Sequence, residues 1–600
     1  MRNTLLILVL TLIFSVSSAI TSQELERSRN SGELIVGKGI ADTETEAKQA
    51  ALEELASMII TNVKVSNTNI TEEKDMKASE YFKSVMETYS NVELQNAEIY
   101  VEREKSKYIV YRYITQEDKT KLFRDRKSQI IELVTEGELA EGRKNGVDAL
   151  RNYYWAFILL QTHPDKNSMT YYIDGKERNL GVALTGKIET ILKDIEIDLE
   201  MINCEDGANC VEIVLSAEYK AKPADGLLIK YFDGFNYSDS ERWSNGMGCI
   251  TLKKSMAETM PVLKLEIDPT FSNHASAGLI RTAVQGLKWK KFNGALKEVN
   301  IKKVPPQTRP NSITFSSEIK SEEAEALRVI VSAINNREPV NARRLFTVEG
   351  FRDFNALIGY GDAVIIPQNT DLSVWDINGY RVVRSIPMKF SFRSSKEPFS
   401  ESVNFSFDGE GKVDGITFAL SNKAVEDIYA KDENYASKEN KALIVDFMER
   451  YKTAYCLKDT TFLRNVFTDD ALIIIGRVIK REPDPTIESM TKQLGDDKVE
   501  YIKVSKKEYI QRVKEQFARK DFINIRFTDN KFQPLESKDS KMYGIQIGQY
   551  YYSDDYADKG YLFLMFDLKD SNKPRIMVRS WQPEKNPDGS IVGVMDFQFE

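Results

Sequence analysis

The chain has 600 residues, of which 42% are apolar and 29% charged, and 83 basic against 91 acidic side chains give a formal net charge of −8. This apolar share suffices for ordinary packed cores, and the length predicts about four domains at about 100–200 residues each. The acidic balance and the lack of a long basic patch argue against nucleic acid as a partner, because phosphate binding requires clustered Lys and Arg.

The first 19 residues are typical of an export signal. Arg2 precedes an apolar run over 5–14, and Ser17, Ser18 and Ala19 supply small residues for cleavage. The run is too short to span a bilayer, and no later segment reaches the roughly 18 apolar residues that a span requires. We therefore predict a signal peptide over 1–19, no transmembrane span, and a location in the periplasm or at the cell surface of a bacterium.

Residues 31–65 predict a strand, a glycine turn, a helix and a second strand. Thr43 and Glu46 form a capping box at the start of the helix. The helix carries a stripe that would let it lie close to a sheet, made of Ala47, Ala50, Ala51, Leu55, Met58 and Ile59. A further helix and two strands are predicted over 78–89, 97–102 and 108–114.

Gly37-Lys38-Gly39 has the spacing that begins a dinucleotide-binding loop, but Asp42 stands where the third glycine should be, so we interpret the glycines as structural. The pattern resembles the lipoprotein-20 family of bacterial envelope proteins, and the matching residues are Gly37, Gly39, Ala47, Ala51 and Leu55. The resemblance implies a small α+β envelope domain over 31–116. The chain lacks that family's lipidated cysteine, since its first cysteine is Cys204.

Residues 117–197 predict helices, with a break at Gly142 and Gly146. The second helix is aromatic and ends at His163-Pro164, and its stripe at helical spacing is interpreted as core rather than as a cofactor site. The two helices resemble one tetratricopeptide unit, which cannot bury its apolar face alone and should dock on a neighbouring domain. A third amphipathic helix is predicted over 181–197.

Between 198 and 301 the apolar period drops to two, with glycine turns between short strands. This region resembles a bacterial immunoglobulin-like β-sandwich. Trp243 has two interpretations, a carbohydrate-stacking side chain or a core residue that anchors a loop, and we favour the second. Three prolines within 302–312 predict an extended linker.

Cysteine and histidine usage restricts the chemistry. Cys204 and Cys210 flank a short polar stretch and could form a disulfide in an oxidising compartment, while Cys249 could compete for either partner. The chain has no Cys-x-x-Cys pair and only two histidines, His163 and His274, far apart in sequence. We therefore predict no metal site and no cofactor.

The C-terminal half contains a weak internal sequence repeat. Twelve residues after Tyr455 comes Phe467-Thr468, and twelve residues after Ile334 comes Phe346-Thr347. The helix before the second copy has one apolar face, made of Ile444, Phe447, Met448, Tyr451 and Tyr455. Alternating strands follow in both copies, so we predict two α+β cones, over 313–432 and 437–600, each with a meandering antiparallel sheet curled round its helices.

The second copy resembles the nuclear-transport-factor-2-like superfamily, which includes ketosteroid isomerase and related dehydratases. The matching residues are Tyr451, Tyr455, Asp459 and the run 466–471, whereas the first copy has Val348-Glu349-Gly350 in place of the acidic pair. The resemblance implies an apolar pocket at the open end of each cone, and thus a small-ligand site in each copy.

Asp446, with Tyr451 or Tyr455 as proton donor, is the best carboxylate arrangement for catalysis in these cones. The alternative, which we favour, is that Asp446 is a solvated residue on the polar face of its helix. Both histidines precede residue 280, so neither cone can supply an internal imidazole. Asp469 and Asp470 are interpreted as turn residues rather than as a paired acid and base.

Together these patterns predict a multidomain α+β protein: a small N-terminal domain, a helical hairpin, a β-sandwich and two cones. The favoured functional hypothesis is a non-catalytic cell-envelope protein, a binding or assembly scaffold with small-ligand pockets in the two C-terminal modules. Its partner would be an envelope protein or a small-molecule or glycan ligand. The alternative is a secreted hydratase, isomerase or hydrolase with a carboxylate base in the C-terminal cone.

Overall fold

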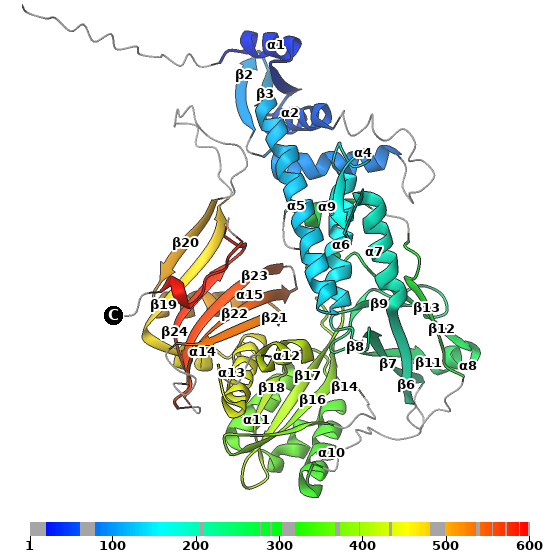
Figure 1. Ribbon diagram of the computed structural model, residues 1–600, viewed down its shortest axis with the longest axis vertical. Helices are drawn as coiled ribbons and strands as arrows, with labels where there is room; N and C mark the ends of the chain where they lie inside the picture. The colour runs from blue at the N-terminus through cyan, green and yellow to red at the C-terminus, as the bar shows by residue number, and fades with distance from the viewer. Residues whose placement is uncertain are drawn as a thin grey trace, which may run out of the picture.

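The fold mixes α-helices with several β-sheets and is described from a computed structural model (Figure 1). The described residues are 20–60, 78–95, 97–173, 175–203, 209–275, 278–287, 291–302, 318–366, 372–394, 397–430, 435–479, 498–535, 541–554, 556–570, 573–586 and 589–597. The predicted signal peptide, nearly all of the predicted linker and Cys204 lie outside them. Within these ranges no helix is long and apolar enough to cross a membrane.

The N-terminal domain is a three-stranded antiparallel sheet of order β1-β3-β2 with helices beside it. Its elements are α1 (Ser22–Ser31), β1 (Leu34–Ala41), α2 (Glu44–Ile59), α4 (Ala78–Thr88), a π-helical turn (Tyr89–Glu93), β2 (Glu98–Glu104) and β3 (Lys107–Thr115). This confirms the predicted first strand, both helices and the two later strands, while α1 was not predicted. The expected strand near residue 65 lies outside the described residues.

Gly37 and Gly39 lie within β1 and do not form the predicted turn. A Cβ atom on Gly37 would come within 2.2 Å of the Ala51 carbonyl oxygen, and one on Gly39 within 2.0 Å of the Ala47 carbonyl oxygen. The glycines and alanines therefore let α2 pack directly on the β1 backbone, which is a structural role, as expected. Thr43 caps α2, since its hydroxyl accepts the Glu46 N–H at 3.3 Å.

The next part is a helical layer formed by α5 (Gln116–Gly142), α6 (Gly146–Gln161) and α7 (Leu180–Asp194) (Figure 1). The short antiparallel strands β4 (Thr170–Ile173) and β5 (Lys176–Asn179) precede α7. The predicted pair of helices with a break near Gly142 is confirmed. Every residue of α6 is buried, because α6 lies between α5 and α7 and also contacts α9 (Leu279–Gly286).

The strands between 195 and 300 belong to two sheets. The first contains β6 (Ile195–Asn203), β7 (Cys210–Tyr219), β8 (Lys222–Pro223) and β11 (Met247–Lys253), and the second contains β9 (Leu228–Tyr231), β10 (Glu241–Arg242), β12 (Val262–Ile267) and β13 (Leu296–Asn300). The short helix α8 (Lys254–Thr259) and a 3-10 turn (Ser272–His274) lie between strands. Trp243 is 1% exposed, which confirms the core interpretation.

The second of these sheets does not end at the predicted domain boundary. Arg242 of β10 pairs in parallel with Phe399 of β17, so β13-β12-β9-β10 continues into the next module as one nine-stranded sheet. The region 198–301 is therefore not the self-contained sandwich that the sequence predicted. Alternation marks a strand, but it does not reveal which distant strand completes its sheet.

Both C-terminal modules begin with helices followed by strands, as predicted, but the prediction missed a helix after the strands of the first module, over 422–429, and one between strands of the second, over 506–519. The first contains α10 (Ser321–Asn335), a 3-10 segment (Pro339–Leu345), α11 (Val348–Gly359), β14 (Val364–Ile365), β15 (Val374–Ile377), β16 (Tyr380–Phe390), β17 (Phe399–Phe407), β18 (Val413–Phe418) and α12 (Asn422–Tyr429). The second contains α13 (Lys438–Cys456), α14 (Thr460–Val466), β19 (Phe467–Ile479), β20 (Lys498–Val504), α15 (Lys506–Arg519), β21 (Ile523–Pro534), β22 (Met542–Ser553), β23 (Ala557–Asp567), β24 (Arg575–Gln582) and a 3-10 turn (Val594–Asp596).

The repeat has a matching topology in the two modules. Phe346 makes a parallel bridge to Val413 at the start of β18, and Phe467 pairs in parallel with Ile576 at the start of β24. The copies then diverge, because Thr347 caps the helix α11, whereas Thr468 continues into β19. The second module has an antiparallel strand pair, β19 and β20, at the edge of its six-stranded sheet of order β20-β19-β24-β23-β22-β21.

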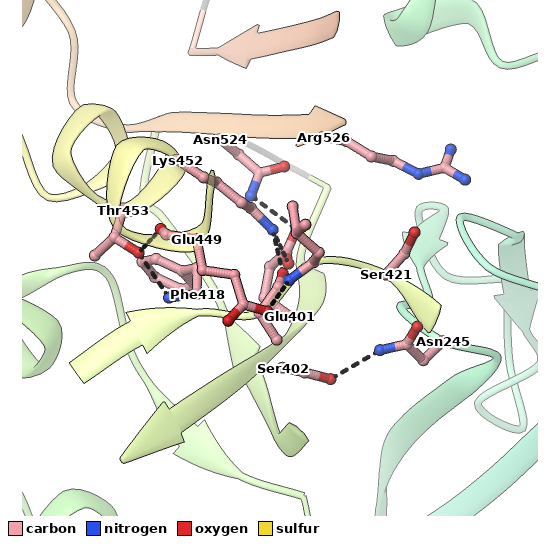
Figure 2. Close-up of polar contacts among 12 residues, drawn as sticks. Asn245, Glu401, Ser402, Phe418, Ser421, Glu449, Lys452, Thr453, Asn524 and Arg526 are labelled. Atoms are coloured by element: carbon pink, nitrogen blue, oxygen red, sulfur yellow. Dashed lines mark hydrogen bonds and ion pairs between the residues drawn. The ribbon is translucent and has the colours of Figure 1, made fainter. Parts of the chain in front are cut away.

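The two modules share one hydrophobic core, so they are not the two separate cups that the sequence predicted. Helix α13 lies between them and is buried on nearly all sides. It also covers the edge strand β18, where the Thr453 hydroxyl accepts the Phe418 N–H at 2.8 Å (Figure 2). Just beyond β18, Glu449 accepts the Leu420 N–H at 2.9 Å. These side chains satisfy edge groups that would otherwise be open to another strand.

Buried ion pairs also cross between the modules. Lys452 of α13 donates to Glu401 of β17 at 2.9 Å, and Asn524 of β21 donates to the other Glu401 oxygen at 3.0 Å (Figure 2). Glu449, which is 1% exposed, accepts from both terminal nitrogens of Arg384. Because a misplaced buried charge would stay unpaired, these contacts favour a single docking of the modules.

The helical layer docks on the outer face of the second module, as the helical pair was expected to dock on a neighbour. Arg151 of α6 binds Asp148 of the same helix at 2.7 Å and donates to the Tyr550 hydroxyl of β22. Arg526 of β21 lies 3.8 Å from Asp148 and also binds Asp225, between β8 and β9, at 2.9 Å. Burial would raise the pKa of Asp148, but Arg151 and Arg526 outweigh it and lower that pKa to about 2. Asp148 is therefore ionised at neutral pH and holds both arginines.

Candidate functional site

The structure does not bring Asp446 together with its predicted proton donors. Asp446 and Tyr451 are five positions apart on α13, and such positions differ by about 140° around a helix. Asp446 pairs with the Nε of Arg450 at 2.9 Å, and its side chain is only 14% exposed. Burial raises the pKa of Asp446, with Arg450 opposing the shift. The solvated-residue interpretation was therefore also wrong, because Asp446 is a largely buried ion-pair partner.

Tyr451 and Tyr455 do lie together, inside the second module. Their hydroxyl oxygens are 3.1 Å apart, Tyr455 contacts the Tyr509 hydroxyl of α15, and the Nε of Arg579 on β24 donates to Tyr451 at 3.3 Å. Burial raises the pKa of Tyr455 and of Tyr509, so both stay protonated at neutral pH. The cluster thus contains phenols and a guanidinium, but no carboxylate or imidazole from the described residues.

The described centre of the first module is aromatic rather than polar. Its centre holds packed aromatic rings, and Phe522 of the second module inserts among them, with its ring centroid 4.5 Å from that of Phe392. Tyr360 also donates to the Ile523 carbonyl oxygen at 2.6 Å, across the boundary between the modules. The second module thus packs against the aromatic centre of the first, where the sequence predicted a ligand pocket.

A pocket of about 440 Å³ lies instead between the two modules. Helix α11 and strands β16–β18 of the first module form one wall, and α13 and α14 form the other. Its charged lining residues are Glu349, Arg352, Asp353, Asp414, Arg450 and Asp459. Its apolar lining includes Ala356, Ile416, Ala454, Leu457 and Phe462.

Arg352 connects the carboxylates of the two walls. Its NH2 lies 3.0 Å from Asp353 of the same helix and 3.7 Å from Asp459, which caps α14 by accepting the Thr461 and Phe462 N–H groups. Burial raises the pKa of Asp353, and the neighbouring Asp459 adds to that rise, while Arg352 opposes it. The Arg352 side chain is 61% exposed, so it can move away when another cation enters.

Several other expectations are settled by position. Asp469 and Asp470 lie at the start of β19 rather than in a turn, and Asp469 pairs with Lys506 at 2.8 Å. Cys249 is four ladder positions from Cys210 along the β7–β11 pair, which is too far for a disulfide. No group of metal-binding side chains occurs within the described part of the chain.

His274 was missed as a neighbour of the second module. Its ring lies 4.7 Å from that of Tyr552 on β22, and its Nε2 is 3.4 Å from Glu397. Burial lowers the pKa of His274 despite the nearby carboxylate. Because β22 presents Tyr552 on the outer face of its sheet, this imidazole is not inside the cone. Nothing in the local sequence around His274 indicates this contact.

The sequence matches no known family profile, and none of the curated proteins compared is similar to it. Partial matches among solved structures include the Bd1075 protein of Bdellovibrio bacteriovorus, at 12% identity and a TM-score of 0.18, over 29% of this chain and 57% of that one. Naphthalene 1,2-dioxygenase with indole bound matches at 7% identity and a TM-score of 0.18, over 25% of this chain and 78% of that one. The Kfla4162 protein of Kribbella flavida matches at 14% identity and a TM-score of 0.17, over 24% of this chain and 89% of that one. Similarity this low carries no argument about fold or function.

Proposed function

We propose that this protein is an exported, non-catalytic envelope protein that acts as a modular binding scaffold and holds a small ligand between its two C-terminal modules. The observation that carries the proposal is the pocket of about 440 Å³ walled by both modules. Because the modules share a core, the walls are already in place before a ligand enters, which lowers the ordering cost of binding. The export pattern over residues 1–19 supports the proposed location.

The charges of the pocket favour a cationic ligand. Four carboxyl groups line it against two guanidinium groups, and one of the latter, Arg450, is already paired with Asp446 outside the lining. A primary amine would take the place of Arg352 between Asp353 and Asp459, and an apolar body would contact Leu457. Charge-assisted hydrogen bonds to carboxylates are the strongest polar contacts available there.

Two observations count against Asp446 as the base of the enzyme alternative: it pairs with Arg450 and does not line the pocket. Asp353 is the remaining carboxyl group in the pocket whose pKa is raised, and an enzyme would have to use it. Its backbone contact with Ile416 and its ion pair with Arg352 are both structural contacts. We therefore prefer binding without turnover. Replacing Asp353 distinguishes the two hypotheses, because only the enzyme alternative requires it as a base.

A thermal-shift screen of the full-length protein tests the proposal, with primary amines each matched to its N-acetylated counterpart. We expect amines to raise the Tm and the neutral counterparts to have little effect. Ala356→Trp, which fills the pocket from α11, should abolish the shift. Asn355→Trp adds the same ring at the next position, which is exposed and outside the lining, and should preserve it.

An amine response that survives Ala356→Trp would place the ligand elsewhere and defeat the proposal. Mass spectrometry of each stabilising amine after incubation addresses catalysis. Conversion to product that stops in Asp353→Asn would establish the enzyme alternative instead.

A further inference from the structure

Arg579 is a buried cation without a counter-ion in the described structure. It lies on β24, with 8% of its surface exposed, and its side chain reaches Tyr451 and Tyr509 in the interior of the second module. Taking a guanidinium out of water costs several kcal/mol unless a carboxylate or another anion compensates it. Every other arginine with a comparably buried side chain in the described ranges has a carboxylate partner, namely Arg126, Arg151, Arg242, Arg384 and Arg526.

The groups around Arg579 leave more hydrogen-bond donors than acceptors available. Its Nε donates to Tyr451 at 3.3 Å, and its guanidinium lies 4.9 Å from the centre of the Tyr509 ring. Neither terminal nitrogen has a hydrogen-bond or ion-pair partner among the described residues. The hydroxyl groups of Tyr451, Tyr455 and Tyr509 form two contacts with one another, and each contact uses one hydroxyl hydrogen. The third hydroxyl hydrogen therefore remains free to donate. The phenolic oxygens can also accept, but the unused N–H and O–H donors outnumber them, and a site with surplus donors is complementary to an anion.

We infer that the interior of the second module binds a small organic anion, a carboxylate with an apolar body, whose oxygens meet the two terminal nitrogens of Arg579. Since Nε is occupied, the free end of the guanidinium offers two parallel N–H donors, the geometry that a carboxylate accepts in a bidentate manner. Toward the rim, Trp581 faces Ile475 across the β19–β24 pair, and both are only partly buried, so an apolar tail has matching surfaces.

This site is separate from the pocket between the modules and has the opposite charge preference. It does not depend on the proposed amine site, because Arg579 and Tyr509 do not line that pocket. Ala356→Trp should therefore leave anion binding intact. The two assignments can fail independently.

The test is calorimetric titration of the full-length protein with octanoate and with octanamide, which share a tail and differ in charge. We expect octanoate to bind at least about tenfold more tightly, the value of one charge-assisted pair of hydrogen bonds. Arg579→Gln should remove that preference, and Tyr509→Phe should weaken octanoate binding. Arg575→Gln is the control, because Arg575 is exposed on the same strand and donates to the Asn465 carbonyl oxygen.

Stability without ligand separates binding from a structural role. Removing a buried charge that has no counter-ion should leave the Tm of Arg579→Gln unchanged or raise it. A lower Tm together with unchanged octanoate affinity would mean that Arg579 only positions the tyrosines, and would overturn the inference. So would equal binding of octanoate and octanamide, or chloride competing as well as octanoate, since the latter would indicate an inorganic anion only.

Discussion

Replacing Glu449 with Gln tests whether α13 holds the two C-terminal modules together. The carboxylate is 1% exposed and accepts from Arg384 of the first module, from Asn404 at 3.0 Å and from the Leu420 N–H at 2.9 Å. Gln keeps the shape but leaves the Arg384 guanidinium buried without a negative partner. Breaking a buried pair from one side costs about 3–5 kcal/mol, so we expect a loss of that size in the free energy of unfolding.

The assay is urea denaturation of the full-length protein, followed by far-UV circular dichroism and by hydrogen exchange of both modules. The shared core predicts that 321–430 and 437–597 lose protection together in the variant. Glu439→Gln is the matched control, because Glu439 is exposed on the same helix, and its effect should stay within about 0.5 kcal/mol. A loss below about 1 kcal/mol for Glu449→Gln, or a change confined to one module, would refute the reasoning.

Three further outcomes follow from the contacts. Gly39→Ala should destabilise the N-terminal domain by about 1–3 kcal/mol in denaturant melts, because its Cβ would meet the Ala47 carbonyl, whereas Gly186→Ala in the open part of α7 should be neutral or stabilising. Burial raises the pKa of Asp558 to about 6, so between about pH 4 and 6 the folded state holds a proton that the unfolded chain has released. The free energy of unfolding should therefore fall as the pH rises from about 4 to 6. Asp558→Asn should remove this pH dependence in melts recorded across that range. Asp148→Asn should lower the Tm, since it leaves Arg151 and Arg526 with one carboxylate fewer, and should abolish the loss of stability that Asp148 contributes as pH falls from about 4 toward 2.

The sequence predicted the elements better than their partners. Periodicity located α10, α13 and the C-terminal strands because each has a local apolar pattern. The docking of α13 between two modules was not predictable in this way. Its buried polar residues Glu449 and Lys452 resemble an ordinary solvated face, and their partners Arg384 and Glu401 lie far away in sequence.

The candidate site shows the same division. Tyr451 and Tyr455 were placed inside the second module because they belong to the apolar face of a helix. Asp446 was assigned the wrong neighbours, since proximity in sequence does not place two residues on the same side of a helix. Arg579 could not be found in this way. Ile576 and Val578 continue the apolar alternation, which would place Arg579 on the outer face, but the pairing of β24 with β23 shifts register between Ile576 and Val578, so Arg579 turns inward.

A crystal structure of the full-length protein with the most strongly stabilising primary amine tests the central claim most directly. We expect the amine between α11 and α13, with its nitrogen bonded to Asp353 and Asp459, Arg352 turned outward, and the compound chemically unchanged. An amine bound at any other surface, or a reaction product in its place, would contradict it.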